Sequence, residues 1–357
     1  MTKLISLAAA AVLLSVTAMA SPALAQIIPM TAGEEADQAE FDAAMSLLET
    51  DPEAGLARIR SLADAGSPWA LTALGAILVQ GPDADPVEAE QAWRRAIALD
   101  QDAARLNLAT HVLVGTIKGD YAEAVSLLEA ITDETLAPYV SYPLGRAYLF
   151  GHGVPQDMAR GSTLMIEAAA AAPENIDARF LAGRALMNGW GIPAVPAAAR
   201  GHLRYAADLG HELAQWNLGM LLLEGQGGPA DPVEARRYVQ MSAENGYYQG
   251  QISMAVMLAL GQGGPVDGPG ARDWYGRAAR EGSAHAMRGL GMMLITGEGG
   301  AANPVTGWAL LELAAEAGEE PAAKLMELLL EQGFKPDRPA VDAARQEILA
   351  ITGEPWI

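Results

Sequence analysis

A pattern of small and apolar residues recurs along this chain about every 36 residues. One copy runs from Leu213 to Gly246, and its small and leucine positions return 36 and 72 residues later. Each copy is centred on a Gly or Ala that we call the marker: Gly75, Ala109, Gly145, Gly183, Gly219, Ala255 and Gly291. A fixed period in this range predicts a stacked repeat architecture.

Each copy predicts two antiparallel helices joined by a glycine loop. In the first helix, small residues at the marker and five positions before it allow close packing, and leucines one before and three after it form a buried stripe. The loop G-Q-G-G-P, at 225 and again at 261, ends that helix with residues free to adopt left-handed dihedrals. Asp231 and Pro232 then start the second helix as N-cap and first-turn proline. The chain is expected to be all-α.

The repeat pattern divides the chain into four parts. They are a signal peptide at 1–25, an N-terminal capping pair of helices at 26–66, a solenoid of about seven units at 67–335, and a C-terminal capping helix and tail at 336–357. The unit at 103–136 is degenerate, because Lys118-Gly119-Asp120 replaces the longer glycine loop. Glu327 stands where the next marker glycine should be.

The N-terminal segment predicts export. Lys3 is followed by an apolar run from Leu4 to Ala20 and by the A-x-A site Ala23-Leu24-Ala25. This arrangement is typical of a secretory signal peptide, with an uncleaved anchor as the alternative. No later segment is apolar enough to predict a membrane span, and the absence of cysteine excludes a lipid-modified N-terminal cysteine. We therefore expect a soluble, periplasmic protein that is not a lipoprotein.

The net charge of −21 bears on the class of partner. Such an acidic chain is poorly suited to the phosphate backbone of a nucleic acid or to an anionic membrane surface. Neither is expected as a partner.

At these residues the chain resembles the Sel1-like repeat family, which is related to tetratricopeptide repeats. The family pattern is matched by Ala214, Leu218-Gly219, Gly225-Gln226-Gly227, Asp231, Ala235 and Gly246, and again by Leu290-Gly291, Gly297-Glu298-Gly299, Ala314-Ala315 and Gly318. Shorter matches occur at Gly151-His152-Gly153 and Gly189-Trp190-Gly191. The resemblance implies an α-solenoid of antiparallel helix pairs in a right-handed superhelix that binds proteins or peptides.

Motifs for catalysis and metal binding are incomplete. His211-Glu212-Leu213-Ala214-Gln215 begins like a zinc-protease helix, but Gln215 occupies the position of the second histidine ligand. The glycine loops lack the Lys-Ser/Thr pair of a phosphate-binding loop and precede an acid. No G-x-S-x-G or S-x-x-K motif occurs. We therefore expect no catalytic residue, no metal site and no cofactor.

Two positions of each first helix are candidates for binding. They lie three before and one after the marker, so they share a helix face, and they are not the small or leucine positions that hold helices together. In the first repeat these positions hold Thr72 and Ala76. In the later repeats the candidates are Tyr142 and Arg146, Phe180 and Arg184, Trp216 and Met220, Ile252 and Val256, and Arg288 and Met292. By resemblance to tetratricopeptide-type repeats this face lines a concave groove. The alternative is that these side chains pack between successive first helices.

The sequence thus predicts a non-catalytic scaffold or regulator of the cell envelope that binds a protein or peptide in this groove. A second hypothesis is a polysaccharide-binding or polysaccharide-assembly component, which would need Trp190, Trp216 and Trp274 exposed in a row. A third is a cell-wall hydrolase, which would need carboxylates that converge in a cleft. The sequence does not determine the oligomeric state.

Overall fold

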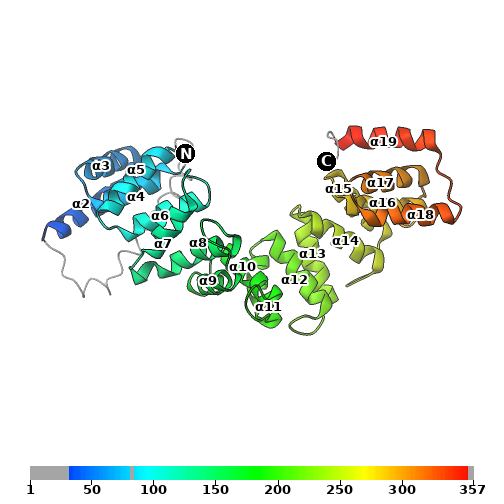
Figure 1. Cartoon of the computed structure of the whole chain (residues 1–357), viewed down its shortest axis with the longest axis horizontal. Helices are drawn as coiled ribbons and strands as arrows, with labels where there is room; N and C mark the ends of the chain where they lie inside the picture. The colour runs from blue at the N-terminus through cyan, green and yellow to red at the C-terminus, as the bar shows by residue number, and fades with distance from the viewer. Residues whose placement is uncertain (1–31, 81–83, 353–357) are drawn as a thin grey trace. The chain divides into compact units, whose positions relative to one another are not determined.

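A computed structural model describes residues 32–80 and 84–352, so the predicted signal peptide and the last five residues lie outside the described part. Within that part the chain forms eighteen α-helices and one 3-10 helix, with no strand, which confirms the all-α prediction (Figure 1). The elements are α2 (Ala32–Thr50), α3 (Pro52–Asp64), α4 (Pro68–Leu78), α5 (Pro86–Ala98), α6 (Asp102–Leu113), α7 (Tyr121–Glu129), η1 (Glu134–Leu136), α8 (Ala137–Phe150), α9 (Met158–Ala171), α10 (Ile176–Asn188), α11 (Pro196–Asp208), α12 (Glu212–Glu224), α13 (Pro232–Glu244), α14 (Tyr248–Leu260), α15 (Gly268–Arg280), α16 (Ala284–Thr296), α17 (Pro304–Glu316), α18 (Glu320–Glu331) and α19 (Arg338–Thr352).

Successive helices pack as pairs in an α-solenoid, and the chain forms two compact units. Among the described residues, the first unit comprises 32–80, 84–178 and 190–192, and the second comprises 179–189 and 193–352. Within each unit the even-numbered α-helices from α4 to α16 are first helices and carry the markers, and the odd-numbered helices from α5 to α17 are second helices.

The markers are small because the second helix of each pair passes close to them. A Cβ added to Gly219 would lie 2.6 Å from Cγ2 of Val239, and one added to Gly183 would lie 2.7 Å from Cγ of Leu203. Both distances are far below van der Waals contact. Larger side chains there would force the helices of a pair apart.

The two glycines of each loop have different functions. Gly225 takes φ 71° as the left-handed C-cap of α12, as the sequence predicted. Gly227, with φ 75°, instead touches the preceding pair, because a Cβ there would lie 2.6 Å from the backbone nitrogen of Ala197 in α11. Glycines at the same loop position touch the start of the preceding second helix at Gly153, Gly191, Gly263 and Gly299. The second loop glycine is therefore a contact between repeats.

An arginine near the start of three second helices reinforces this contact. Arg272 in α15 donates to the backbone oxygens of Met293 (2.8 Å), Ala301 (3.0 Å) and Gly300 (3.3 Å), in the following pair. Arg200 donates to the backbone oxygens of Leu221, Gln226, Gly228 and Pro229. Arg236 donates to the backbone oxygen of Pro265. These guanidinium groups thus bind the carbonyls of the glycine loop and of the end of the preceding first helix in the following pair.

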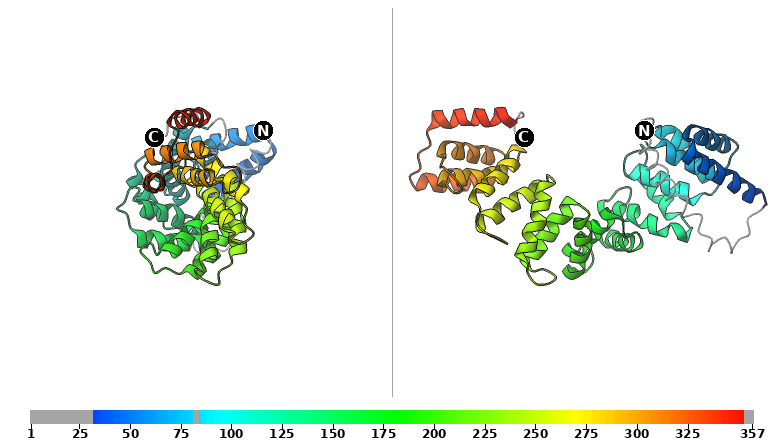
Figure 2. Two further views of the ribbon diagram at one scale, coloured as in Figure 1. Left: turned by 90° about the vertical axis from the view of Figure 1, so that its right-hand side faces the viewer. Right: turned by 180° about the vertical axis from the view of Figure 1, so that it is seen from behind.

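The C-terminal helices depart from the repeat. Glu327, at the marker position of α18, is exposed, and among the described residues of α18 only Ala322 is buried. A second helix therefore has no small-residue surface to approach on α18. The last helix, α19, packs on α17 instead, so that α17 lies between α18 and α19 (Figure 2).

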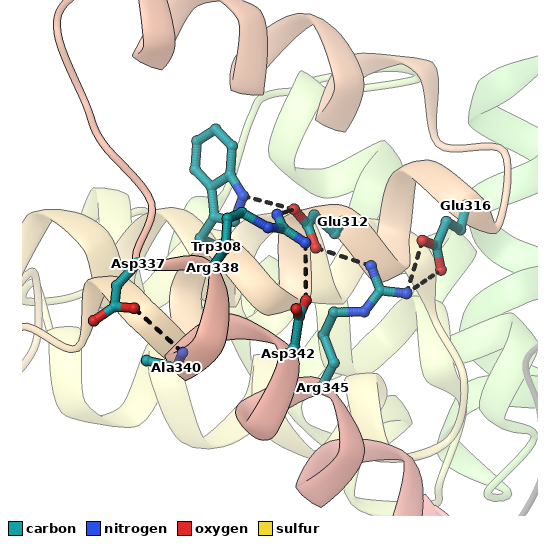
Figure 3. A network of polar contacts seen from close by, with 8 residues as sticks. All are labelled: Trp308, Glu312, Glu316, Asp337, Arg338, Ala340, Asp342 and Arg345. Atoms are coloured by element: carbon teal, nitrogen blue, oxygen red, sulfur yellow. Dashed lines mark hydrogen bonds and ion pairs between the residues drawn. The ribbon is translucent and has the colours of Figure 1, made fainter.

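A buried carboxylate fixes α19 to α17. Glu312 of α17 is 9% exposed and accepts hydrogen bonds from Nε1 of Trp308 (2.8 Å) and from Arg338 and Arg345 of α19 (Figure 3). Beside this network the ring of Phe334 stacks on Trp308 with centroids 4.9 Å apart. Both ion pairs and apolar packing thus attach the C-terminal helices to α17.

Candidate functional site

In the first unit, α8 carries the candidates Tyr142 and Arg146. Tyr142 is partly buried, and its hydroxyl donates to Oδ2 of Asp177 at 3.4 Å. Burial and the nearby Asp177 carboxylate raise the pKa of Tyr142. The Arg146 guanidinium lies 5.8 Å from the centroid of the Tyr142 ring. The two residues therefore share a face, as the spacing predicted, whereas Thr72 and Ala76 of α4 are buried.

In the second unit, Phe180 and Arg184 lie on α10. Phe180 is 7% exposed and packs against the ring of His211, with centroids 4.2 Å apart. His211 is also the N-cap of α12, because its Nδ1 accepts a hydrogen bond from the backbone nitrogen of Ala214. Arg184 is partly exposed, with its guanidinium 5.7 Å from the Phe180 centroid. Phe180 thus joins α10 to α12, and Arg184 reaches the surface beside it.

Trp216 joins α12 to α14 in the same way. Its Nε1 donates to Oγ of Ser253 at 2.9 Å, and its ring meets Tyr247 edge-on at 5.9 Å. Burial raises the pKa of Tyr247. Trp216 nevertheless remains partly exposed, as do Met220 on the same helix and Ile252 and Val256 on α14.

Arg288 joins α16 to α18. Its Nε donates to Oε1 of Glu319 at 2.9 Å, and its Nη2 lies 3.2 Å from a ring nitrogen of His285. Burial and the adjacent Arg288 charge lower the pKa of His285. Met292, one turn further along α16, is partly exposed.

These contacts separate the two candidate positions. In the second unit the residue three before the marker touches a residue 31 positions later, in the pairs Phe180 with His211, Trp216 with Tyr247, and Arg288 with Glu319. This is the packing between successive first helices that the sequence left open as the alternative. The apolar residues one after the marker, Met220, Val256 and Met292, are partly exposed in successive first helices. Unlike Trp216 and Arg288, these three side chains make no hydrogen bond to the next repeat, so they form a regular apolar row on this face.

The three tryptophans proposed to form a sugar-binding row lie on different kinds of element. Trp190 belongs to the loop after α10, Trp216 to a first helix and Trp274 to a second helix, where Arg277 covers its ring at 4.3 Å. All three are partly buried. They do not share one helix face.

The incomplete zinc motif has a structural explanation. His211 caps α12, and the buried Gln215 donates from Nε2 to the Ala207 oxygen of α11 at 3.1 Å. Both side chains therefore hold the turn between α11 and α12. In residues 32–80 and 84–352 no group of three or more His, Asp or Glu side chains is arranged to hold a metal ion. No helix in the same ranges is both long and apolar enough to cross a membrane.

The loop contacts differ from the sequence prediction, in which both loop glycines only end a helix. A signal for these contacts is present in the sequence, because arginines recur at 200, 236 and 272, a spacing of 36 residues. That spacing was a usable signal, because it equals the repeat period.

Comparisons with known proteins agree with this geometry. The family model for the Sel1 repeat matches residues 142–172, 176–211, 213–247, 249–283 and 284–319. Each match covers one helix pair, from α8 and α9 to α16 and α17. No curated protein matches the chain significantly.

Similar chains are found among solved structures. A Sel1 repeat protein from Oxalobacter formigenes is 26% identical with a TM-score of 0.52, over 63% of this chain and 90% of that one. A protective antigen of uropathogenic Escherichia coli strains that displays an SLR fold is 18% identical with a TM-score of 0.40, over 91% of this chain and 86% of that one. With five repeat matches in phase with its helix pairs, the chain belongs to the Sel1-like repeat family.

Proposed function

We propose that this protein is a non-catalytic scaffold of the cell envelope that binds a protein or peptide through the exposed face of its first helices. The Sel1 repeat fold is typically a scaffold for protein–protein interaction. The proposal adds the binding face and the location.

The observation that carries the proposal is the row Met220, Val256 and Met292. These apolar side chains are partly exposed at the same position of three successive first helices. Flexible methionines adapt to different apolar partners. An apolar row that repeats with the helices would match a partner segment carrying apolar side chains at regular intervals.

Arginines at the candidate positions of the first helices favour a carboxylate in the partner. Arg184 and Arg288 are partly exposed on α10 and α16 of the second unit, and Arg146 is partly exposed on α8 of the first. An arginine can bind a carboxylate through two parallel hydrogen bonds. Arg288 already binds Glu319, so a partner carboxylate there would have to compete with it.

The envelope location rests on the N-terminal sequence alone. Residues 1–25 carry the charge, apolar run and A-x-A site of a signal peptide. Export directed by that segment would place the helical units outside the cytoplasm.

The binding face can be tested by site-specific photo-crosslinking in the full chain. A crosslinking residue at 220 or 256 is expected to capture a partner, whereas one at Val233, which is 69% exposed on the second helix α13, is not. The double substitution Met220→Glu and Val256→Glu should then weaken binding of the purified partner at least tenfold, with Val233→Glu as the matched control. Equal crosslinking from both surfaces, or equal affinity of both variants, would refute the proposal that the partner binds the first-helix face.

A further inference from the structure

Three aromatic rings gather at the surface of the first unit, where the start of α7 meets the end of α8 and the loop after it. Tyr121 is the first residue of α7, Phe150 the last of α8, and His152 follows in the loop after α8. The His152 ring lies 5.4 Å from that of Tyr121 and 5.9 Å from that of Phe150, centroid to centroid. Tyr121 is 39% exposed and Phe150 is 47% exposed. We call these three residues the ring cluster.

The backbone holds the ring cluster in place. Gly153, the second glycine of the loop, lies against the start of α7, so that an added Cβ would be 2.5 Å from the Ala122 nitrogen. This is the contact between repeats that every glycine loop makes. The loop that carries His152 is therefore fixed beside Tyr121 whether or not the rings touch.

Repeat packing does not require aromatic residues at these positions. The residue that matches Phe150 is Asn188, Glu224, Leu260 or Thr296 in the later repeats, and the residue that matches His152 is Trp190, Gln226, Gln262 or Glu298. The first position of the second helix, where Tyr121 stands, is proline in α5, α11, α13 and α17. Only at the junction of α7 and α8 do aromatic residues occupy all three. Exposed apolar surface that packing does not explain marks an interaction site.

The next junction in this unit extends the apolar surface. Met158, the first residue of α9, is 38% exposed, and Gln156 reaches its sulfur at 4.0 Å. The loop residue Gly191 lies against Ala159, beside Met158, and Trp190 precedes it. The ring cluster and Met158 thus lie at the same edge of successive repeats, where loops meet second helices.

Charges around the ring cluster favour a cationic partner. Asp120, the N-cap of α7, directly precedes Tyr121, and Asp157, the N-cap of α9, directly precedes Met158. Arg160 does not offset the acids, because it binds Glu129 at 3.0 Å. Over residues 36–80 and 84–178 acidic side chains outnumber basic ones by 21 to 8, against 19 to 14 over residues 179–352. The face of an aromatic ring also attracts cations.

We propose that the ring cluster Tyr121, Phe150 and His152 is a docking surface for a lysine- or arginine-bearing peptide segment of a partner protein. The rings would hold the basic side chains by cation–π contact, and the acidic surface of the first unit would attract the segment. The ring cluster belongs to the first unit, whereas Met220, Val256 and Met292 belong to the second, so the two can be tested independently.

The test uses the full chain and labelled octapeptides in which glycine alternates with lysine, arginine or glutamate. The variant Phe150→Thr with His152→Gln takes its residues from the matching positions Thr296 and Gln226, so it preserves the repeat and adds no acidic or basic side chain. Leu260→Thr, at an equivalent position that is 65% exposed, is the control. Fluorescence anisotropy at low salt gives each Kd, and melting curves report folding.

The lysine and arginine peptides should bind the wild type and the Leu260→Thr variant equally, and the double variant at least fivefold more weakly at unchanged melting temperature. The Met220→Glu and Val256→Glu variant should bind them like the wild type. Equal affinity in the double variant would show that general acidity alone attracts the peptides and would overturn the proposal. So would no binding of either basic peptide, or binding of hexameric N-acetylglucosamine in their place.

Discussion

The attachment of α19 to α17 predicts what happens when the Glu312 charge is removed. Glu312→Gln keeps the size of the side chain and an oxygen that can accept from Trp308. It removes the negative charge that accepts from Nη1 of Arg345 at 2.8 Å and brings amide hydrogens toward the guanidinium groups. Arg345 keeps Glu316 as a partner, at 2.7 Å, so it is not left without a carboxylate.

The expected loss is about 2 kcal/mol, because a hydrogen bond to a charged group contributes roughly 1.5–3 kcal/mol and the Arg345 side chain is 23% exposed. The free energy of local opening of α19 should decrease by this amount, because α19 is held in place by its packing on α17. Amide hydrogen exchange over residues 338–350 should therefore quicken by roughly 30-fold, since about 1.4 kcal/mol corresponds to a factor of ten.

The matched control is Asp342→Asn, another loss of one carboxylate charge in the same network. The Asp342 side chain is 59% exposed and pairs with Arg338 across one turn of α19, so its removal should change exchange less than twofold. If Glu312→Gln also leaves the exchange of α19 within twofold of the wild type, the carboxylate does not hold the helix, and the apolar contacts of Phe334 and Trp308 are sufficient.

Three further predictions concern the pKa of Glu312, the loop glycine Gly227 and the N-terminal segment. Burial opposes ionisation of Glu312, but hydrogen bonds from Arg338, Arg345 and Trp308 outweigh burial and lower the pKa of Glu312. The stabilisation from this carboxylate should therefore be present above about pH 4.3 and lost as the pH falls further. The difference in α19 amide exchange between the wild type and Glu312→Gln should shrink when it is measured from pH 6 down to pH 3. Gly227→Ala combines left-handed strain with a clash against α11, so it should destabilise the second unit by about 2–4 kcal/mol in urea unfolding. Gly246→Ala, with φ 89° and open space around it, should destabilise it by about 1–2 kcal/mol. Equal losses of stability would mean that the loop contact is not tight. N-terminal sequencing of the protein from the periplasmic fraction should begin at Gln26, and an intact Met1 would indicate a retained anchor.

Much of the fold could be predicted because the residues that make it recur. Gly219 and its equivalents must be small wherever two helices pack closely, and Gly225 and its equivalents must accept left-handed dihedrals wherever a first helix ends. Seven spaced markers therefore specified the helix pairs. The same repetition limited the prediction of the site, since residues that repeat report packing rather than binding.

The candidate face was predictable only in part. Spacing placed Trp216 and Met220 on one side of α12, and the structure keeps them there. Spacing could not show that Trp216 meets Tyr247 and Ser253 of the next repeat while Met220 remains at the surface. That distinction depends on where the next helix lies.

The sequence by itself determined the local rules of this protein: the helix pairs, their caps, their order and the family to which they belong. These follow from steric and dihedral requirements that act over a few residues and are repeated in phase. Only the tertiary structure decided the contacts between repeats, because each joins residues about 20 to 40 positions apart whose approach depends on the stacking of whole helices. The loop contact of Gly227, the attachment of α19 through Glu312 and the ring cluster around His152 are all of this kind.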